Sequence, residues 1–392
     1  MYTHWKNRTG RFLAAQTVSL LGSSLVQYAI VWHLTLTTAS GAVLTLSTLC
    51  GFLPQILISL FAGVWIDRYD RKVLAMLSDT LIALATLLLA VAFLTGHGSV
   101  GLLLGILAVR SAGTGVQTPC VNALLPQLVP QEHLMRINGV QSTLNSAILF
   151  LSPALSGAVL AALGLEATFF IDVITAVLGV GITFFIPIPR LARTGTGQSA
   201  LADIRVGFAY LRTSAFVRRL LGFQLTVLFL ISPSAFLTPL MVSRTFGPQV
   251  WRLTASEMTY SLGMVLGGAL IAAWGGTRER LRTTALAGLA YGGLMIAMGL
   301  SPVFPAYLLF NCLIGLTAPC YNAPITVSIQ ERVEPERHGR VFGLMQISTS
   351  CALPLGMVVF GPLADRVPIQ ALLIGCGLAV AGVCAGARKW LR

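Results

Sequence analysis

Apolar residues run in long blocks along this chain, separated by short clusters of charged residues or Pro-Gly turns. A helix needs roughly 20 apolar residues to cross the hydrocarbon core of a bilayer. The blocks reach that length and lack the ten-residue alternation of membrane β-strands. The pattern therefore predicts an all-α membrane protein with twelve transmembrane helices. We place these spans near 12–34, 42–66, 73–95, 99–123, 138–162, 167–187, 216–240, 256–274, 281–300, 304–328, 340–364 and 370–388.

The composition agrees with this pattern and excludes an ordinary soluble domain. Of 392 residues, 55% are hydrophobic and 10% are charged, and the mean hydropathy is +0.81. Residues 1–11 are polar and basic, and no small-residue cleavage site follows the first span, so we expect no cleaved signal. All seven cysteines fall inside predicted spans without ligand spacing, so we expect no metal and no cofactor.

The net charge of +13 is a topology signal and does not predict nucleic-acid binding. With both termini in the cytoplasm, 22 of the 26 basic residues fall in inner segments, as the positive-inside rule requires. Those segments are 1–11, 67–72, 130–137, 189–219, 275–282, 329–340 and 388–392.

The chain repeats itself. Residues 115–123 and 315–323 share five identities at a constant offset of 200, each near the end of a predicted span. We therefore predict an N-terminal six-helix bundle (1–189), a cytoplasmic linker (190–215) and a C-terminal six-helix bundle (216–392). Such repeats form a substrate site near the membrane midplane, between the halves.

A charged loop joins the second and third predicted spans. It contains Gly63-x-x-x-Asp67-Arg68-x-Asp70-Arg71-Lys72, and a weaker copy covers 275–282. Read alone, the loop is a turn that sets topology. A third segment, Gly361-x-x-x-Asp365-Arg366, has similar spacing, but the span count puts it at an outer helix end.

These residues resemble the major facilitator superfamily. The loop at 63–72 resembles its motif A, the run from Arg110 to Gly115 resembles motif B, and Ser152-Pro153 with Gly157 is similar to a degraded motif C. Asp70, where motif A usually has Gly, matches the macrolide-efflux branch of the drug:proton antiporters. Further similarities to that branch are Gln16 to Leu21, Gly51 to Pro54, Val129 to Leu134, Ile171 to Val173 and Gly339 to Phe342.

The resemblance implies a secondary active transporter of the bacterial inner membrane. It exports hydrophobic small molecules or drugs by alternating access, coupled to protons, and we expect a monomer. In this family, motif A acts as a conformational gate, with Asp67 near the start of span eleven. The gate residues are Gly63, Asp67, Arg68, Asp70, Arg71 and Lys72.

Three charged residues lie inside predicted spans and away from the span ends: Asp79, Arg110 and Asp172. A charge there costs at least about 2.5–3.5 kcal/mol, so each is a candidate for proton coupling. The alternatives are an ion pair between Asp79 and motif A, and an outer helix cap at Asp172. We expect Arg110→Ala to abolish coupled transport and to leave folding largely intact.

Polar amides in apolar spans are candidates for substrate binding, although helix–helix hydrogen bonding explains many such residues. Spans one, four, seven and ten line the cavity in this superfamily. With aromatic neighbours, the candidates are Gln27, Tyr28, Trp32, Gln117, Gln224, Phe229 and Asn311. No acidic residue lies deep in predicted spans one, seven, eight or ten, which favours a bulky, mostly apolar substrate. Pro153 and Gly157 are candidates for helix flexing, or are ordinary membrane-helix residues.

Several other functions fit the sequence less well. No phosphate-binding loop is present, so ATP drive is not expected, and no catalytic constellation indicates an enzyme. The main alternative is a siderophore or metabolite exporter on the same fold. A membrane enzyme or scramblase, or a non-transporting partner of an ATP-driven pump, would be a different class of protein.

Overall fold

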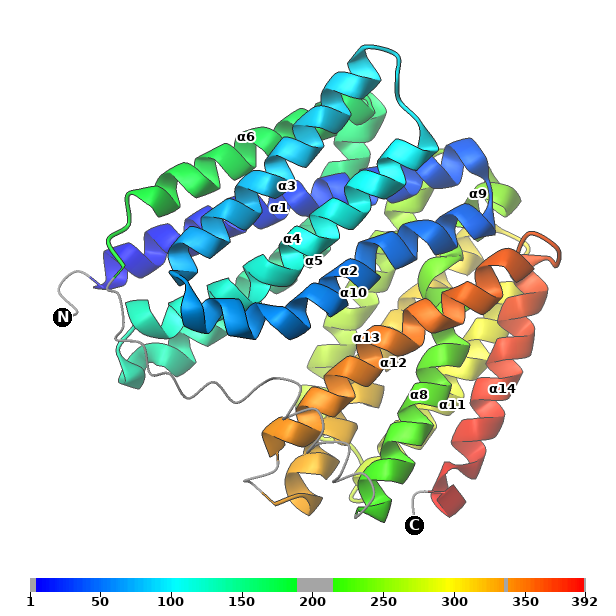
Figure 1. The fold of residues 1–392 in the computed structure, drawn as a ribbon. Helices are drawn as coiled ribbons and strands as arrows, with labels where there is room; N and C mark the ends of the chain where they lie inside the picture. Colours follow the sequence, from blue (N-terminus) through cyan, green and yellow to red (C-terminus); the bar gives the residue numbers. More distant parts are fainter. Residues whose placement is uncertain (1–4, 189–213, 335–337, 391–392) are drawn as a thin grey trace. The chain divides into compact units, whose positions relative to one another are not determined.

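The computed structural model describes residues 5–188, 214–334 and 338–390, and within them it is helical without strands (Figure 1). The predicted all-α fold is confirmed. The helices are α1 (Trp5–Thr38), α2 (Gly41–Arg68), α3 (Arg71–Leu94), α4 (Val100–Leu128), the 3₁₀ turn η1 (Gln131–His133), α5 (Leu134–Leu163), α6 (Leu165–Phe184), α8 (Ala215–Phe236), α9 (Thr238–Phe246), α10 (Val250–Trp274), α11 (Arg280–Gly299), α12 (Phe304–Arg332), α13 (His338–Leu363) and α14 (Ile369–Trp390).

Eleven helical stretches in the described part of the chain are long and apolar enough to cross a membrane. One of them, Ala215–Phe246, combines α8 with α9. The 25-residue α10 is not among the eleven but is long enough to span, and counting it gives the twelve predicted spans. Two predicted starts are several residues late: α1 begins at Trp5 and not near residue 12, and α10 begins at Val250 and not near residue 256.

The chain forms two compact units. Unit 1 contains residues 1–34 and 46–200, and unit 2 contains 35–45 and 201–392. In unit 1, α3 packs against both α4 and α6, while in unit 2 α10 packs on α12, and α11 packs on α12 and α14. The predicted linker at 190–215 lies almost wholly outside the described residues, so the predicted division of the chain stays a prediction.

The internal repeat is visible in how each unit packs. Gly115 of α4 presses against the backbone of Gln55 in α2, and Gly315 of α12 presses in the same way against the backbone of Tyr260 in α10. A Cβ at either glycine would collide with a carbonyl oxygen. Small residues at such crossings let membrane helices approach closely. Residues related by the offset of 200 therefore occupy equivalent helix crossings in the two units.

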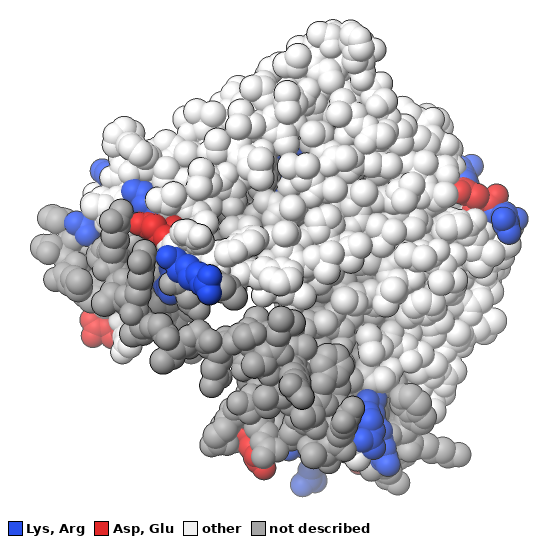
Figure 2. All heavy atoms as spheres, in the orientation of Figure 1, with Lys and Arg blue, Asp and Glu red and all other residues white. Residues whose placement is uncertain are grey.

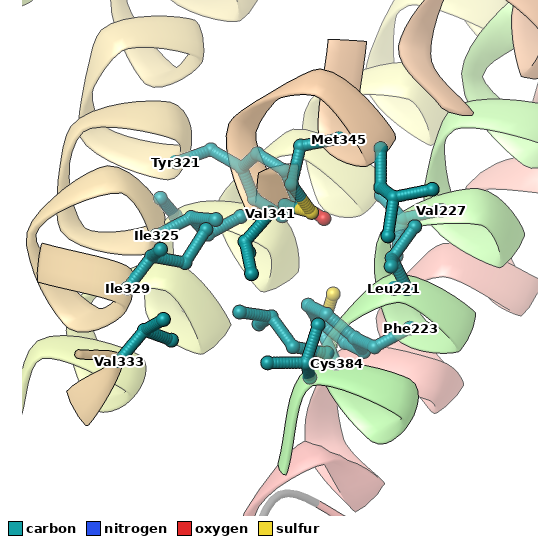
Figure 3. Packing of buried hydrophobic residues seen from close by; sticks show 14 of the residues in the cluster. Leu221, Phe223, Val227, Tyr321, Ile325, Ile329, Val333, Val341, Met345 and Cys384 are labelled. Carbon is teal, nitrogen blue, oxygen red and sulfur yellow. The ribbon is translucent and has the colours of Figure 1, made fainter. Parts of the chain in front are cut away.

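Each unit has its own apolar core near one helix end. In unit 1 it joins Phe12 and Leu13 to Cys120, Leu124 and other buried residues. In unit 2, residues of α8, α12, α13 and α14 converge (Figure 3). The labelled members are Leu221, Phe223, Val227, Tyr321, Ile325, Ile329, Val333, Val341, Met345 and Cys384.

Apolar side chains also cover the outside of the helices. Leu88, Val177 and Leu378 are more than half exposed, as are many other large apolar residues. Figure 2 shows helix surfaces that are almost free of charge, with the coloured Lys, Arg, Asp and Glu side chains near helix ends. This distribution is the one expected of helices in contact with lipid.

A carboxylate caps the first turn of α2 within unit 2. Asp365 accepts hydrogen bonds from the backbone N–H of Gly41 at 2.7 Å and of Ala42 at 3.0 Å, and from the Ser40 hydroxyl at 3.0 Å. Arg244 donates to the same carboxylate at 2.8 Å. An acidic residue at a helix N-terminus satisfies otherwise unpaired N–H groups and favours the helix dipole. The segment expected at an outer helix end is therefore a capping site.

Candidate functional site

The loop at 63–72 ties helix ends together inside unit 1. Asp70 is the N-cap of α3, and its side chain accepts from Lys72 N at 2.9 Å and Val73 N at 3.5 Å. Arg71 donates to the carbonyl oxygens of Ile66 at 3.4 Å and Ala123 at 3.2 Å.

The neighbouring Lys72 reaches the end of α6. Its Nζ donates to the carbonyl oxygens of Phe184 and Ile186, both at 2.8 Å. Cations at these carbonyl-rich ends of α2, α4 and α6 are favoured by the helix dipoles. Arg68 is exposed, and a side chain at Gly63 would meet open space. The Asp67 side chain lies outside the described residues, so its gating role stays a prediction.

One polar layer in unit 1 contains Asp79. The Asp79 carboxylate accepts a 2.8 Å hydrogen bond from the Gln117 amide, whose nitrogen also lies 3.5 Å from Gln16 Oε1. Asp79 and Gln117 are buried. The contact that the structure shows for Asp79 is therefore with Gln117, and not an ion pair with the motif-A-like loop. It joins α3 to α4.

A second polar layer contains the two other charges predicted in the spans. Arg110 forms a buried ion pair with Asp172 and also bonds Thr86. Thr86 donates to Asp172 at 2.9 Å, Ser23 Oγ donates to it at 3.1 Å, and Arg110 donates to the Ser23 carbonyl at 3.2 Å. Asp172 is only 1% exposed, so it is a buried partner of Arg110 rather than an outer cap.

The two layers are built from the same three helices in the same order. In α1, Gln16 and Ser23 are seven residues apart, as are Asp79 and Thr86 in α3 and Gln117 and Arg110 in α4. Seven residues make nearly two helical turns, so each pair lies on one helix face, about 10 Å apart along the axis. Unit 1 therefore carries a two-layer polar ladder in an otherwise apolar interior.

The first layer borders a cavity. A cavity of about 180 Å³ between α1, α4 and α5 is lined by Gln16 and Gln117. Asn122, Gln141 and Asn145 line it as well. The sequence alone did not single out Gln141, because one glutamine near the start of a span carries no periodic signal. In the second layer, Thr86, Arg110 and Asp172 are at most 5% exposed.

The other substrate candidates of unit 1 lie on α1. Gln27 and Tyr28 are half-buried, and the Tyr28 and Trp32 rings lie 5.5 Å apart. Trp32 is 1% exposed and is among the largest fully buried side chains of the molecule. In this conformation Trp32 is a packing residue, and its predicted contact with substrate is not tested.

The candidates of unit 2 hold helices to one another. Gln224 of α8 donates to Thr349 of α13 at 3.3 Å, while its Oε1 is buried without a partner among the described residues. Asn311 of α12 donates to the Ser256 carbonyl of α10 at 2.7 Å. The ring of Phe229 lies 5.3 Å from that of Phe360. Among these three side chains, Gln224 has a buried oxygen, Oε1, that could accept a hydrogen bond from a substrate.

One acidic residue was missed. Because α10 begins six residues earlier than predicted, Glu257 lies two turns inside the helix, directly after Ser256. Its carboxylate has no hydrogen-bond or ion-pair partner among the described residues. The expectation that span eight has no deep acidic residue is therefore wrong. Charged residues typically end a span, and Arg252 therefore places the predicted boundary too close to Glu257.

The candidates for helix flexing lie in α5. Pro153 and Gly157 are buried within α5, whose Ser156 donates to the Leu25 carbonyl of α1 at 2.9 Å. Their role in flexing stays a prediction.

Among the described residues, no group of His, Cys, Asp or Glu side chains could hold a metal ion.

Comparison with known proteins covers nearly the whole chain. The family model of the Major Facilitator Superfamily matches residues 12–357 and, in a second match, 248–391. Macrolide efflux protein A of Streptococcus pyogenes is 30% identical over 390 residues, which are 98% of this chain and 96% of that protein. Multidrug efflux pump Tap of Mycobacterium bovis is 25% identical over 404 residues, covering 97% and 92%.

Solved structures agree at the level of the fold. The crystal structure of a bacterial homologue of the iron transporter ferroportin, in an inward-facing state, superposes with a TM-score of 0.70. It is 16% identical and covers 98% of both chains, so this similarity concerns architecture alone. The chain belongs to the Major Facilitator Superfamily.

Proposed function

We propose that this protein is a secondary active transporter that exports hydrophobic, macrolide-like small molecules in exchange for protons. The names of its relatives support efflux, since they include macrolide and multidrug efflux proteins. The observation that carries proton coupling is the polar ladder of unit 1. It holds a carboxylate beside a cavity and a second carboxylate locked against an arginine, in helices that are otherwise apolar.

Asp79 is the proposed proton acceptor. It lies in the layer next to the cavity, and Gln117 donates to it while lining that cavity. Protonation replaces an anionic acceptor with a neutral carboxyl group that can itself donate, which weakens the charge-assisted bond. Gln117 is then released to turn its amide towards the cavity. Proton uptake is in this way converted into a change at the wall that substrate meets.

Arg110 and Asp172 have a different proposed part. Their ion pair is sealed from the cavity and links α4 to α6. In a buried, mutually neutralised pair, removing one charge leaves the other unpaired. The pair therefore holds α4 fixed relative to the outer helices of unit 1, while the Asp79 layer about 10 Å away along α3 changes its protonation state.

The remaining parts of the cycle follow the family resemblance. Gln27, Tyr28, Gln117, Gln224, Phe229 and Asn311 are the proposed substrate contacts. The loop from Gly63 to Lys72 is proposed to bias which face of the carrier is closed, with both termini in the cytoplasm. A bias of one or two kcal/mol shifts a two-state population by about tenfold, so a few helix-end contacts suffice.

The test is proton-driven transport of a macrolide by purified protein in liposomes. An imposed pH gradient should drive macrolide movement by the wild-type protein, and an uncoupler should abolish it. Asp79→Asn keeps the size of the side chain and cannot titrate, so gradient-driven transport should fall by at least tenfold. Glu132→Gln is the matched control, because Glu132 is 77% exposed outside the spans, and it should transport like wild type.

Two results would contradict this proposal. Wild-type transport that ignores the pH gradient and the uncoupler would exclude proton coupling. Gradient-driven transport by Asp79→Asn at the wild-type rate would remove Asp79 from the mechanism. If no macrolide moves while a siderophore does, the substrate class is wrong.

A further inference from the structure

A large cavity lies at one end of unit 2, far along the chain from the polar ladder. It measures about 570 Å³ and opens between the start of α11, the end of α12 and α14. Four arginines and two glutamates line it. These are Arg278, Glu279, Arg280, Arg282, Glu331 and Arg332.

The floor of this cavity is apolar. Leu281, Ala285 and Leu289 of α11 form it, and they also pack on the core cluster of unit 2. Cys384, which belongs to that cluster (Figure 3), closes the floor from α14. Leu286, 47% exposed, extends the apolar wall outwards. The cavity is therefore cationic at its rim and apolar along its depth.

The rim arginines are held in different ways. Arg280 pairs with Glu331 at 3.3 Å and donates to the Gly275 carbonyl at 3.0 Å, which fixes the start of α11 to the end of α12. The Arg332 guanidinium lies 4.7 Å from the centre of the Phe216 ring. Arg278 and Arg282 are exposed and have no ion-pair partner among the described residues. Two guanidinium groups at the mouth are thus open to an anion.

The height of the rim in the membrane can be read from the preceding helix. Trp274, 53% exposed, is the last residue of α10, and Gly275 and Gly276 then turn the chain with positive φ angles of 72° and 79°. Exposed tryptophans mark the headgroup region of a bilayer. Arg278 and Arg282 follow within eight residues of Trp274, so they lie at headgroup level.

We propose that this cavity, defined as the α11–α14 pocket, binds the phosphate headgroup of an anionic membrane phospholipid. Guanidinium groups recognise phosphate oxygens in paired geometry, and basic pockets between membrane helices hold anionic headgroups. The apolar floor accommodates the start of an acyl chain. A positive-inside signal alone requires basic residues, and it requires neither a cavity nor an apolar floor.

The 190–213 segment of the same chain is unlike the ligand that the α11–α14 pocket would attract, because the segment is itself positively charged. It contains four arginines and a single acidic residue, Asp203. A cationic rim repels such a segment, whereas it attracts a phosphodiester. A soluble phosphate ester would meet the same arginines but would leave the apolar floor in water. The amphipathic lining therefore favours a lipid.

The experiment measures binding of phosphatidylglycerol to purified, delipidated protein in detergent, by native mass spectrometry and by the shift in Tm. Wild-type protein should retain phosphatidylglycerol and gain thermal stability, with a smaller effect of phosphatidylcholine and none of glycerol phosphate. The double variant R278A/R282A should bind about 10- to 30-fold more weakly, on the basis of the typical contribution of each basic residue.

Two further variants separate a built pocket from general charge. Arg219→Ala removes an exposed arginine of α8 outside the lining, and it should bind phosphatidylglycerol like wild type. Ala385→Trp keeps every charge but fills the cavity from the exposed wall of α14, and it should lose most of the binding. Each variant without lipid should melt at the wild-type temperature, which reports on folding separately.

Three results would overturn the proposal. These are no phosphatidylglycerol binding by wild type, equal protection by glycerol phosphate, and a loss in Arg219→Ala as large as in R278A/R282A. None of these measurements uses substrate or a proton gradient. Failure of lipid binding is therefore distinguishable from failure of the proposed transport.

Discussion

At the scale of single residues, the buried Arg110 and Asp172 of unit 1 are stable because each has a partner. Arg110 and Asp172 lie almost completely out of water, and Thr86 and Ser23 satisfy the remaining oxygens of the carboxylate. Removing one member of a buried ion pair strands the other, which costs more than removing both. This pairing argues against the expectation that Arg110→Ala leaves folding intact.

We therefore predict a marked non-additivity at this pair. Arg110→Gln and Asp172→Asn should each destabilise the protein by about 3–5 kcal/mol, and the double variant should recover more than half of that loss. Thermal unfolding of detergent-purified variants in a double-mutant cycle measures the coupling. Additive losses would mean that the two side chains do not act as a pair.

The repeated glycines make a second residue-level prediction. Gly115→Ala should destabilise unit 1 by about 1–3 kcal/mol, because the added Cβ would meet the Gln55 carbonyl at the crossing with α2. Gly105 lies in the same helix with open space around it, and Gly105→Ala should be neutral or stabilise by up to about 1 kcal/mol. Equal changes in Tm for the two variants would show that helix propensity, not packing, governs these sites.

At the scale of whole elements, the first turn of α2 depends on a residue more than 300 positions away. Burial alone would raise the pKa of Asp365, but hydrogen bonds from Gly41, Ala42, Ser40 and Arg244 outweigh it and hold the pKa below its usual value. The ionised form is therefore the one that the folded protein favours. A group with a lowered pKa stabilises the fold above its unfolded pKa, and that stability is lost as pH falls through the folded value.

The resulting prediction concerns stability in acid. Asp365→Asn should be less stable than wild type by about 1–3 kcal/mol at neutral pH. The difference should stay constant down to about pH 5 and shrink below about pH 4, the ordinary range of an aspartate. Tm measured from pH 3 to 8 tests this, with Glu132→Gln as an exposed control. A difference that is the same at pH 3 and pH 7 would show that ionisation of Asp365 is unimportant.

Element boundaries also show where sequence reasoning stops. Long apolar blocks predicted the helices because bilayer thickness fixes their length, but polar residues at a span end are ambiguous. The predicted span eight starts near 256 and leaves Arg252 outside, whereas α10 begins at Val250 and contains both Arg252 and Glu257. Asp172 was ambiguous for the same reason, and only its three-dimensional neighbours identify it as a buried partner.

At the scale of the molecule, the long apolar blocks make some of the ladder's polar residues visible in the sequence but do not predict their pairing. The sequence marks Asp79, Arg110 and Gln117 as polar residues in apolar spans. Which of them meet depends on the register of α3 against α4, and no repeat within either helix encodes that register. The family resemblance placed Trp32 at a substrate wall, but a motif does not predict that this side chain is only 1% exposed in the structure.

Topology is the property of the whole molecule that remains to be measured, and the charge pattern makes a definite prediction. His97 lies in the exposed turn between α3 and α4, and Met135, 89% exposed, lies at the start of α5 beyond the opposite end of α4. With the N-terminus inside, His97→Cys should react with a membrane-impermeant maleimide in intact cells. Met135→Cys should react only after the membrane is opened.

The chain is suited to this experiment because all seven native cysteines lie within helices and are buried or half-buried. Wild-type protein should therefore give little background labelling and serves as the control. If Met135→Cys reacts in intact cells and His97→Cys does not, the orientation in the membrane is the opposite one, and the motif-A-like loop lies outside the cell. Reaction of both variants in intact cells would mean that α4 does not cross the membrane, and the positive-inside assignment would then fail along with the twelve-span count.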